Sequence, residues 1–348
     1  MTRRQDKVAV VGTTCWGTTL AVMLGRKGLD VDLIARTEDE ARKLSREREN
    51  TAHLPGFPFP PGVRAVASLD EGLGDSGMVI LAVPAQNMRA NVRMVRAHLD
   101  HSVLLLNVAK GLELDTALRM SEVISEEVDP PIRANISVLS GPNLSQEIAR
   151  GLPATTVIAA ADASVAARAQ KILATPLFRV YVNTDMVGVE LGGVLKNVIA
   201  LAAGMVDGLG YGDNAKAGLI TRGLAEITRL GVAAGAKPLT FAGLAGLGDM
   251  VATCSSCLSR NRFVGQELAR GRSLNKIMTA MSGVAEGVTT TVAALTMAGK
   301  YKIEMPITRE VYRVLYEGLE VRKAVSELMG RELKEEFADI LRSSGEQA

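Results

Sequence analysis

The sequence has few aromatic residues, histidines and cysteines, and almost no net charge. Aromatic residues make up 3% of the 348 residues, and there are three histidines and three cysteines. Three cysteines cannot build the disulfide framework of a small secreted domain, which favours a reducing cytoplasm. The 40 basic residues nearly cancel the 38 acidic ones, leaving a net charge of +2. With so few aromatics and so little positive charge, nucleic-acid binding is not expected.

Long apolar runs are missing as well. No stretch reaches the roughly 18 consecutive apolar residues of a membrane-spanning helix. The N-terminal residues 1–7 carry three basic side chains but run directly into a strand pattern, without the apolar core of a signal peptide. We therefore expect a cytoplasmic protein with no integral membrane segment. The hydrophobic share of 47% is typical of a globular protein, and the length suggests about two domains.

A metal centre is not expected either. Cys254 and Cys257 have the spacing of half a zinc site, but the sequence contains no second pair to complete it. We interpret the two cysteines as small packing residues and predict no bound metal.

Glycine, by contrast, is abundant in one region. Of the 34 glycines, 14 lie within residues 188–248. Glycine allows close backbone approach because it has no Cβ atom. We hypothesise that this stretch packs helices closely and brings main-chain donors near a ligand.

Apolar runs alternate with helical patterns in the first half of the chain. The predicted strands cover residues 7–11, 30–35, 78–83, 102–108, 136–139, 155–160 and 178–182. Helical patterns cover residues 15–27, 37–48 and 86–99, and residues 50–62 form a proline-rich loop. Apolar strands that alternate with helices predict βαβ units and a mostly parallel, doubly wound sheet.

The pattern changes near residue 185, after which only helices are expected. They cover residues 187–205, 215–234, 258–270, 273–281, 288–298, 308–317 and 321–329, with a charged terminal helix over 331–339. The sequence thus predicts two domains, 1–185 and 186–348, the second all-α.

A glycine loop follows the first predicted strand and opens a helix. Gly12, Thr14 and Gly17 occupy the three glycine positions of the G-x-G-x-x-G dinucleotide fingerprint, with threonine in the middle. The backbone N–H groups at such a helix start can hold a pyrophosphate. The Thr14 hydroxyl would either compensate for the lost glycine or weaken cofactor binding.

The end of the second strand bears on the choice of cofactor. That strand runs into Arg36, with no acidic residue directly beyond it. An acid there would bind the ribose hydroxyls of NAD, whereas an arginine can meet the 2′-phosphate of NADP. The cofactor is therefore NADP or NAD, with NADP weakly favoured.

Further motifs follow in order along the chain. They are Val83-Pro84-Ala85-Gln86, Lys110-Gly111-Leu112-Glu113, Ser140-Gly141-Pro142-Asn143, Leu195-Lys196-Asn197-Val198, Gly246-Leu247-Gly248-Asp249, Ser259-Arg260-Asn261 and Glu286-Gly287. With the glycine loop, this ordered set resembles bacterial-type NAD(P)-dependent glycerol-3-phosphate dehydrogenase from about residue 7 to about 330. The resemblance implies a Rossmann-like N-terminal domain, an all-α C-terminal domain and a homodimer.

The resemblance also implies residue roles. Lys196 would transfer the proton, with Lys110 and Asp249 as further catalytic residues. The implied substrate-binding residues are Lys110, Gly141, Asn143, Lys196, Asp249, Ser259, Arg260 and Asn261. The implied cofactor-binding residues are Gly12, Thr14, Cys15, Trp16, Gly17, Arg36, Lys110, Ser145, Arg260, Val284 and Glu286.

The implied reaction interconverts dihydroxyacetone phosphate and sn-glycerol 3-phosphate and feeds glycerophospholipid synthesis. Two rivals remain at this point: a reductase of another small keto or sugar-phosphate substrate, and a sensor that binds NAD(P)H without catalysis. Each residue also has a plain alternative. Lys196 could be a surface lysine, Asp249 a helix N-cap, and Arg260 a solvated helix residue.

Overall fold

The computed structural model describes residues 7–281, 283–332 and 336. Within them the chain forms two compact units. The first comprises the described residues up to Lys110 together with Arg119–Met186, and the second comprises Gly111–Leu118 and the described residues from Val187 onward. Most of the charged helix expected over 331–339 lies outside the described residues.

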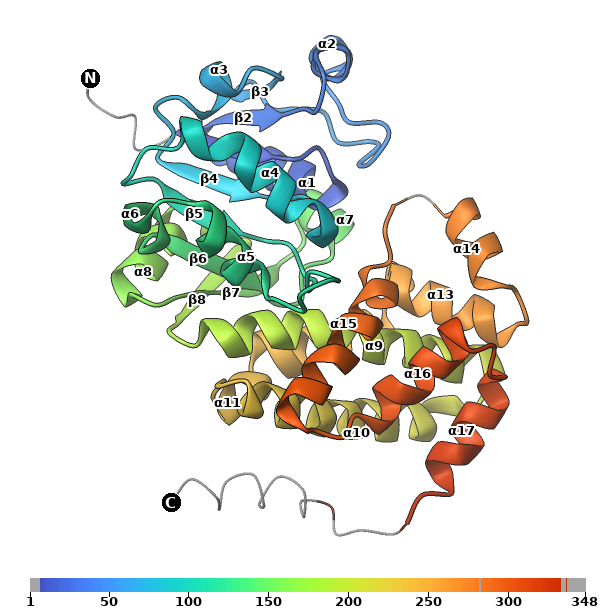
Figure 1. The fold of residues 1–348 in the computed structure, drawn as a ribbon. Coiled ribbons are helices and arrows are strands. Elements are labelled where there is room, and N and C mark those ends of the chain that lie inside the picture. Colours follow the sequence, from blue (N-terminus) through green and yellow to red (C-terminus); the bar gives the residue numbers. More distant parts are fainter. Residues whose placement is uncertain (1–6, 282, 333–335, 337–348) are drawn as a thin grey trace. The chain divides into compact units, whose positions relative to one another are not determined.

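The first unit is built on a sheet of eight described strands (Figure 1). The strands are β1 (Lys7–Val11), β2 (Asp30–Ile34), β3 (Val63–Val66), β4 (Met78–Leu81), β5 (Leu104–Asn107), β6 (Ile136–Ser140), β7 (Ala154–Ala160) and β8 (Phe178–Asn183). Their order is β3-β2-β1-β4-β5-β6-β7-β8, and all neighbours pair in parallel except the antiparallel β6–β7 pair. The Rossmann-like, mostly parallel sheet predicted from the sequence is therefore confirmed.

Helices and short turns connect these strands. They are α1 (Cys15–Arg26), α2 (Glu38–Glu47), α3 (Leu69–Leu73), η1 (Ala85–Asn87), α4 (Met88–Val95), η2 (Arg96–His98), α5 (Met120–Glu127), α6 (Pro130–Arg133), α7 (Ser145–Ala149) and α8 (Ala163–Leu173). Helix α1 packs on α7, and α4 packs on α5 (Figure 1). The central strands β1, β4 and β5 are buried almost throughout, which explains their continuous apolar sequences.

The second unit contains only helices among its described residues. They are α9 (Met186–Leu209), α10 (Gly212–Ala233), α11 (Pro238–Phe241), η3 (Leu244–Gly248), α12 (Asp249–Ser255), α13 (Arg260–Ala269), α14 (Leu274–Ala280), α15 (Glu286–Tyr301), α16 (Pro306–Tyr316) and α17 (Val321–Met329). Their apolar faces form one core, which includes Leu195, Leu230 and Met250.

Helix α9 is the core helix of this unit. By length and apolarity it is the one described helix that could by itself cross a membrane, but 89% of its 18-residue apolar window is buried inside the protein. Its hydrophobicity therefore serves packing against neighbouring helices. It also carries Lys196, which is buried.

One short segment of the first half belongs to the second unit. Gly111–Leu118 was expected within a domain spanning residues 1–185, but the structure groups it with the helices. The reason is apolar contact, because Leu112 and Ala117 are buried in the helical core.

Candidate active site

The glycine loop lies between β1 and α1 and is shaped by tight contacts. Gly12 has a φ of +107°, and a Cβ atom there would lie 2.8 Å from the carbonyl oxygen of Ala82. A Cβ on Gly17 would lie 2.3 Å from the carbonyl oxygen of Gly12. Both positions therefore require glycine, one for the turn and one for the approach of the helix to the strand.

Thr14, at the middle position of the fingerprint, is held by hydrogen bonds within the loop. It is the N-cap of α1, and its hydroxyl accepts a hydrogen bond from the Gly17 N–H at 3.1 Å. The same hydroxyl donates to the Ala82 carbonyl at 2.8 Å. The threonine thus ties the loop to the end of β4 and stabilises the helix start.

The first residues of α1 fit a bound pyrophosphate. The first-turn N–H groups of a helix have no partner within the helix and attract anions. The neighbouring Trp16 indole nitrogen is buried and has no hydrogen-bond partner among the described residues. A ligand group at this loop would satisfy such a donor. Cys15, beside it, is half-buried with a free thiol.

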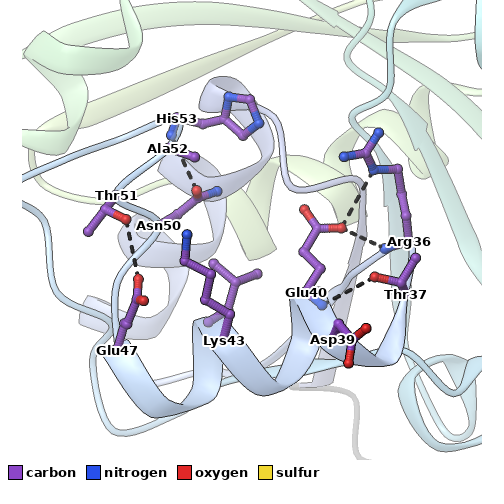
Figure 2. Close-up of a pocket in the computed structure, with 11 residues that line it drawn as sticks. Arg36, Thr37, Asp39, Glu40, Lys43, Glu47, Asn50, Thr51, Ala52 and His53 are labelled. Atoms are coloured by element: carbon purple, nitrogen blue, oxygen red, sulfur yellow. Dashed lines mark hydrogen bonds and ion pairs between the residues drawn. The ribbon is translucent and has the colours of Figure 1, made fainter.

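Arg36 lies past the end of β2, at the rim of a cavity of about 640 Å³ lined by residues of α2 and the following loop (Figure 2). Its Nε lies 3.5 Å from the carboxylate of Glu40, and the arginine side chain is 81% exposed. The sequence showed no acid directly after β2, yet the fold brings one there from α2. This site therefore combines a cation suited to a phosphate with an acid suited to ribose hydroxyls.

A second group of predicted residues gathers at the end of β6. Lys110 Nζ donates to the carbonyl oxygen of Gly141 at 2.9 Å. The Asn143 amide nitrogen donates to Thr156 Oγ1 at 2.9 Å, whereas its Oδ1 is buried without a partner among the described residues. Ser145 begins α7 and accepts, through its carbonyl oxygen, a long 3.4 Å hydrogen bond from Thr19 of α1. The structure thus brings Lys110, Gly141 and Asn143 together at the end of β6. It also places the start of α7 against α1.

The second unit holds a buried ionic cluster around Lys196. Its Nζ lies 2.9 Å from Oδ1 of Asp249, with side-chain exposures of 7% for the lysine and 2% for the aspartate. Lys196 also donates to Thr253 Oγ1, which in turn donates to Asp249 Oδ1 at 3.1 Å. The burial excludes the surface-lysine alternative for Lys196. Asp249 is the first residue of α12 and its carboxylate faces Lys196, so it is not the N-cap.

Thr253 was missed by the sequence reasoning. It lies four residues after Asp249, which places both on one face of α12. That spacing was the available signal, but a lone threonine in a helix indicates no function until its partner from α9 is known.

An amide chain links α9, α13 and α15 beside this cluster. Asn261 Nδ2 donates to Asn197 Oδ1 at 2.9 Å, and Asn261 Oδ1 accepts from the Gly287 N–H at 3.0 Å. Ser259 is the N-cap of α13 and accepts from the Arg262 N–H. Asn261 and Ser259 are buried and fixed by hydrogen bonds. Asn197, to which the sequence analysis gave no role, is a further member of this chain of amides.

Arg260 is exposed, at the first turn of α13. Its guanidinium passes so close to Gly283 that a Cβ atom there would lie 2.4 Å from it. Val284 follows in the same loop and is 42% exposed, and Glu286 begins α15. These three predicted residues lie at one end of α13 and α15, on the same unit as Lys196.

Glycines set the spacing of the helices that carry the cluster. A Cβ on Gly204 of α9 would lie 1.9 Å from the Arg262 carbonyl oxygen, and one on Gly265 of α13 would lie 1.9 Å from the Leu201 carbonyl oxygen. A Cβ on Gly287 would lie 2.7 Å from the Asn197 carbonyl oxygen. Of these three, Gly204 belongs to the glycine-rich stretch 188–248, and a Cβ on Gly208 of the same stretch would lie 2.7 Å from the Gln266 carbonyl oxygen, so the expected close packing occurs between α9 and α13.

The two cysteines of the C-x-x-C pair differ in environment. Cys254 is fully buried, and burial raises the pKa of its thiol to about 12, so it is protonated and serves packing. Cys257 is exposed, so the expected packing role does not apply to it. Among the described residues, no three His, Cys, Asp or Glu side chains are grouped to hold a metal ion.

Comparison with known proteins finds relatives that match most of the chain. Family models described as NAD-dependent glycerol-3-phosphate dehydrogenase N-terminus and C-terminus match residues 7–166 and 185–326. A glycerol-3-phosphate dehydrogenase (NAD(P)+) of Dehalococcoides mccartyi is 54% identical, covering 96% of this chain and 93% of its own. The corresponding Chlorobium limicola protein is 47% identical, covering 94% and 99%. A crystal structure of glycerol-3-phosphate dehydrogenase from Coxiella burnetii matches with a TM-score of 0.89 at 36% identity, covering 94% and 99%.

Proposed function

The chain belongs to the NAD-dependent glycerol-3-phosphate dehydrogenase family, and from that premise we propose which residues carry its reaction. It is an NAD(P)-dependent oxidoreductase that interconverts dihydroxyacetone phosphate and sn-glycerol 3-phosphate. Its cofactor is NAD or NADP. The family membership decides against the reductase of another substrate and against the non-catalytic sensor.

Lys196 gives the proton to the substrate oxygen when the ketone is reduced, and takes it back in the reverse direction. The observation that carries this assignment is a buried ammonium held by Asp249 and Thr253. Buried lysines are rare, and a proton donor must be held in a fixed position. When bound, the nicotinamide cofactor supplies or accepts the hydride.

Asp249 and Thr253 position the ammonium. Asp249 provides the counter-charge that offsets the cost of burying Lys196. The hydrogen bonds to Asp249 and Thr253 occupy two of the three N–H donors of the ammonium, which leaves one for a substrate oxygen.

The phosphate of the substrate is bound by Arg260, with Asn261 and Ser259 beside it. A guanidinium is a forked donor that suits a phosphate. The amide nitrogen of Asn261 has two hydrogens and the bond to Asn197 uses one, so the other can reach a substrate oxygen.

In the first unit, Lys110, Gly141 and Asn143 complete the substrate residues that the resemblance implies. The partnerless Oδ1 of Asn143, a buried acceptor, suits a substrate hydroxyl.

The cofactor is held by the glycine loop and by the residues that the resemblance implies. The proposed set is Gly12, Thr14, Cys15, Trp16, Gly17, Arg36, Lys110, Ser145, Arg260, Val284 and Glu286. The support from contacts is strongest at the loop, where the helix start and the Trp16 indole offer donors.

Replacement of Lys196 tests the central assignment. General acid–base catalysis contributes about 10²–10⁴-fold, so kcat of Lys196→Ala should fall by at least about 100-fold. A small primary amine such as methylamine should restore part of this loss. Lys216→Ala is the matched control, because Lys216 also pairs with an aspartate, Asp207, on the same unit. Near-normal turnover of folded Lys196→Ala, or equal loss in the control, would reject the role.

The wider context of the reaction is also part of the proposal. The sn-glycerol 3-phosphate produced supplies glycerophospholipid synthesis, and the enzyme acts in the cytoplasm as a homodimer. The three free thiols support a reducing compartment. Light scattering of the purified protein tests the dimer, and a monomer at micromolar concentration would reject it.

A further inference from the structure

One carboxylate joins the glycine loop to the end of β2. Glu40 Oε1 accepts a hydrogen bond from Thr13 Oγ1 at 2.6 Å. Its Oε2 accepts from the Arg36 backbone N–H at 3.0 Å and lies 3.5 Å from Arg36 Nε. Figure 2 shows the Arg36 side chain directed at this carboxylate, on the wall of the cavity. The acid is therefore placed between the loop and the exposed arginine.

This carboxylate carries its negative charge at neutral pH. Burial by itself raises the pKa of Glu40, but the hydrogen bonds from Thr13 and Arg36 and the positive charge of Arg36 outweigh burial and lower the pKa. Its charge therefore acts on any ligand group that reaches Arg36.

The position has a chemical meaning in a dinucleotide-binding fold. At the end of the second strand, an acid binds the ribose hydroxyls of NAD, whereas an arginine accommodates the 2′-phosphate of NADP. This chain supplies both, the arginine from the end of β2 and the acid from the first turn of α2. A 2′-phosphate would compete with Glu40 for Arg36 and would be repelled by the carboxylate.

We propose that Glu40 determines the choice between the two cofactors: by holding Arg36 and opposing a 2′-phosphate, it lowers the preference for NADP and lets the enzyme use NAD. The inference rests on the cofactor site proposed at the glycine loop. The weak preference for NADP indicated by Arg36 in the sequence is thereby reduced.

A purely structural role for Glu40 makes a different prediction. Thr37 caps α2 by accepting from the Glu40 N–H, and the Glu40 carboxylate binds the Arg36 N–H, so the residue also stabilises the helix start. If that were its whole function, loss of Glu40 would loosen the loop and weaken every adenine nucleotide alike.

The test compares two probes that differ only by a 2′-phosphate. Adenosine 5′-monophosphate and adenosine 2′,5′-bisphosphate are titrated calorimetrically into the full-length enzyme and its Glu40→Gln and Glu40→Ala variants at low salt. Both variants should raise the affinity for the bisphosphate, relative to the monophosphate, by about three- to tenfold. The ratio of kcat/KM for NADPH to that for NADH should rise in the same direction.

Glu38→Gln is the matched control, because it removes the same charge from the same helical turn without lining the cavity. It should change the affinity ratio by less than about twofold. An unchanged ratio in both Glu40 variants, or an equal loss for both probes, overturns the role of Glu40 while leaving the cofactor site intact. If neither probe binds the wild-type enzyme, the cofactor site fails, and the inference with it.

Discussion

Each unit presents one ion pair at its candidate site, and the two pairs have opposite environments. In the second unit, Lys196 and Asp249 are 2.9 Å apart with side-chain exposures of 7% and 2%. In the first unit, Arg36 and Glu40 are 3.5 Å apart with exposures of 81% and 21%. The Lys196–Asp249 pair is fixed by packed helices, whereas the Arg36–Glu40 pair lies at the rim of an open cavity.

The difference corresponds to two tasks. A buried pair is costly to break, because the remaining charge has no water to solvate it, and its position is set by packing. This suits a group that must deliver a proton at one atom. An exposed pair is screened and worth little, so a ligand charge can compete with it. That suits a choice between two similar cofactors.

The largest effect is expected when the buried pair loses its acid. Asp249→Ala leaves the Lys196 charge without its partner, which costs about 3–5 kcal/mol in the free energy of unfolding. Turnover should fall as well, since the ammonium is no longer positioned. Denaturant unfolding and steady-state kinetics measure the two. The isosteric Asp249→Asn separates the effect of the charge from that of the side-chain shape. A decrease of less than about 1 kcal/mol in the free energy of unfolding of Asp249→Ala would contradict the view that the buried pair is costly to break.

A second buried carboxylate of the same unit, Glu226, sharpens the comparison, because it is not among the proposed site residues. Glu226 accepts hydrogen bonds from the Ile307 and Thr308 N–H groups at 2.8 and 2.9 Å and from the Thr308 hydroxyl at 2.8 Å, at the start of α16. Glu226→Ala should lower the free energy of unfolding by about 1.5–3 kcal/mol, with kcat and KM of the folded enzyme unchanged. A specific loss of kcat would contradict this assignment.

The pH dependence of that variant provides a second readout. Burial raises the pKa of Glu226 above its ordinary value near 4.5, against the opposing effect of its hydrogen bonds. The folded state then holds the proton more tightly than the unfolded state. The stability that Glu226 contributes should therefore decrease as the pH rises from about 4.5 through the folded pKa. Unfolding measured over this range should show the stability difference between the wild type and Glu226→Ala becoming smaller as the pH rises.

Arg260 is exposed but is proposed to bind a doubly charged phosphate. The loss of free energy in Arg260→Ala should therefore lie between the losses expected for the buried Lys196–Asp249 pair and the exposed Arg36–Glu40 pair. A hydrogen bond to a charged group is worth about 1.5–3 kcal/mol, which corresponds to a rise in the KM for dihydroxyacetone phosphate of about 10- to 100-fold in Arg260→Ala. Turnover of unphosphorylated dihydroxyacetone at saturating cofactor is the control and should change little, because it contains no phosphate contact and no longer depends on cofactor binding. An unaltered KM for the phosphorylated substrate would remove Arg260 from the phosphate site.

The smallest effect is expected at the exposed pair. Arg36→Ala should change the free energy of unfolding by less than about 1 kcal/mol and raise the KM for NADPH by about two- to fivefold, with little effect on NADH. The difference should vanish at high salt, where surface charges are screened. A large decrease in the free energy of unfolding of Arg36→Ala would show that the Arg36–Glu40 pair is not the weak ion pair with which a ligand charge can compete.

Much of the fold could be predicted because its signals are local. Buried parallel strands such as β1 and β4 are short continuous apolar runs, and the long helices α9 and α10 have the expected composition. The sequence analysis missed strand β3 (Val63–Val66), because buried and more exposed side chains alternate along it and it directly follows a proline-rich loop. Helices α11 and α12, with 4 and 7 residues, are too short for a clear periodicity.

The candidate site was predictable to the extent that its residues sit in recognisable motifs. The glycine loop and the segments around Lys196 and Arg260 carry their signal in consecutive residues. Thr253 and Glu40 do not, because each acquires its role from a partner on another element, Lys196 of α9 in one case and Thr13 of the glycine loop in the other. The individual roles of these residues stay predictions until the variants are measured.

The sequence by itself determined the alternation of strands and helices, the glycine turn and the order of the motifs, since each depends on neighbouring residues. Only the tertiary structure decided which charges are buried and which remain in water. Lys196 and Asp249 are 53 residues apart, and their pairing depends on how closely α9 and its neighbours pack. Desolvation is a property of that packing, so no local sequence pattern could distinguish the buried Lys196–Asp249 pair from the exposed Arg36–Glu40 pair.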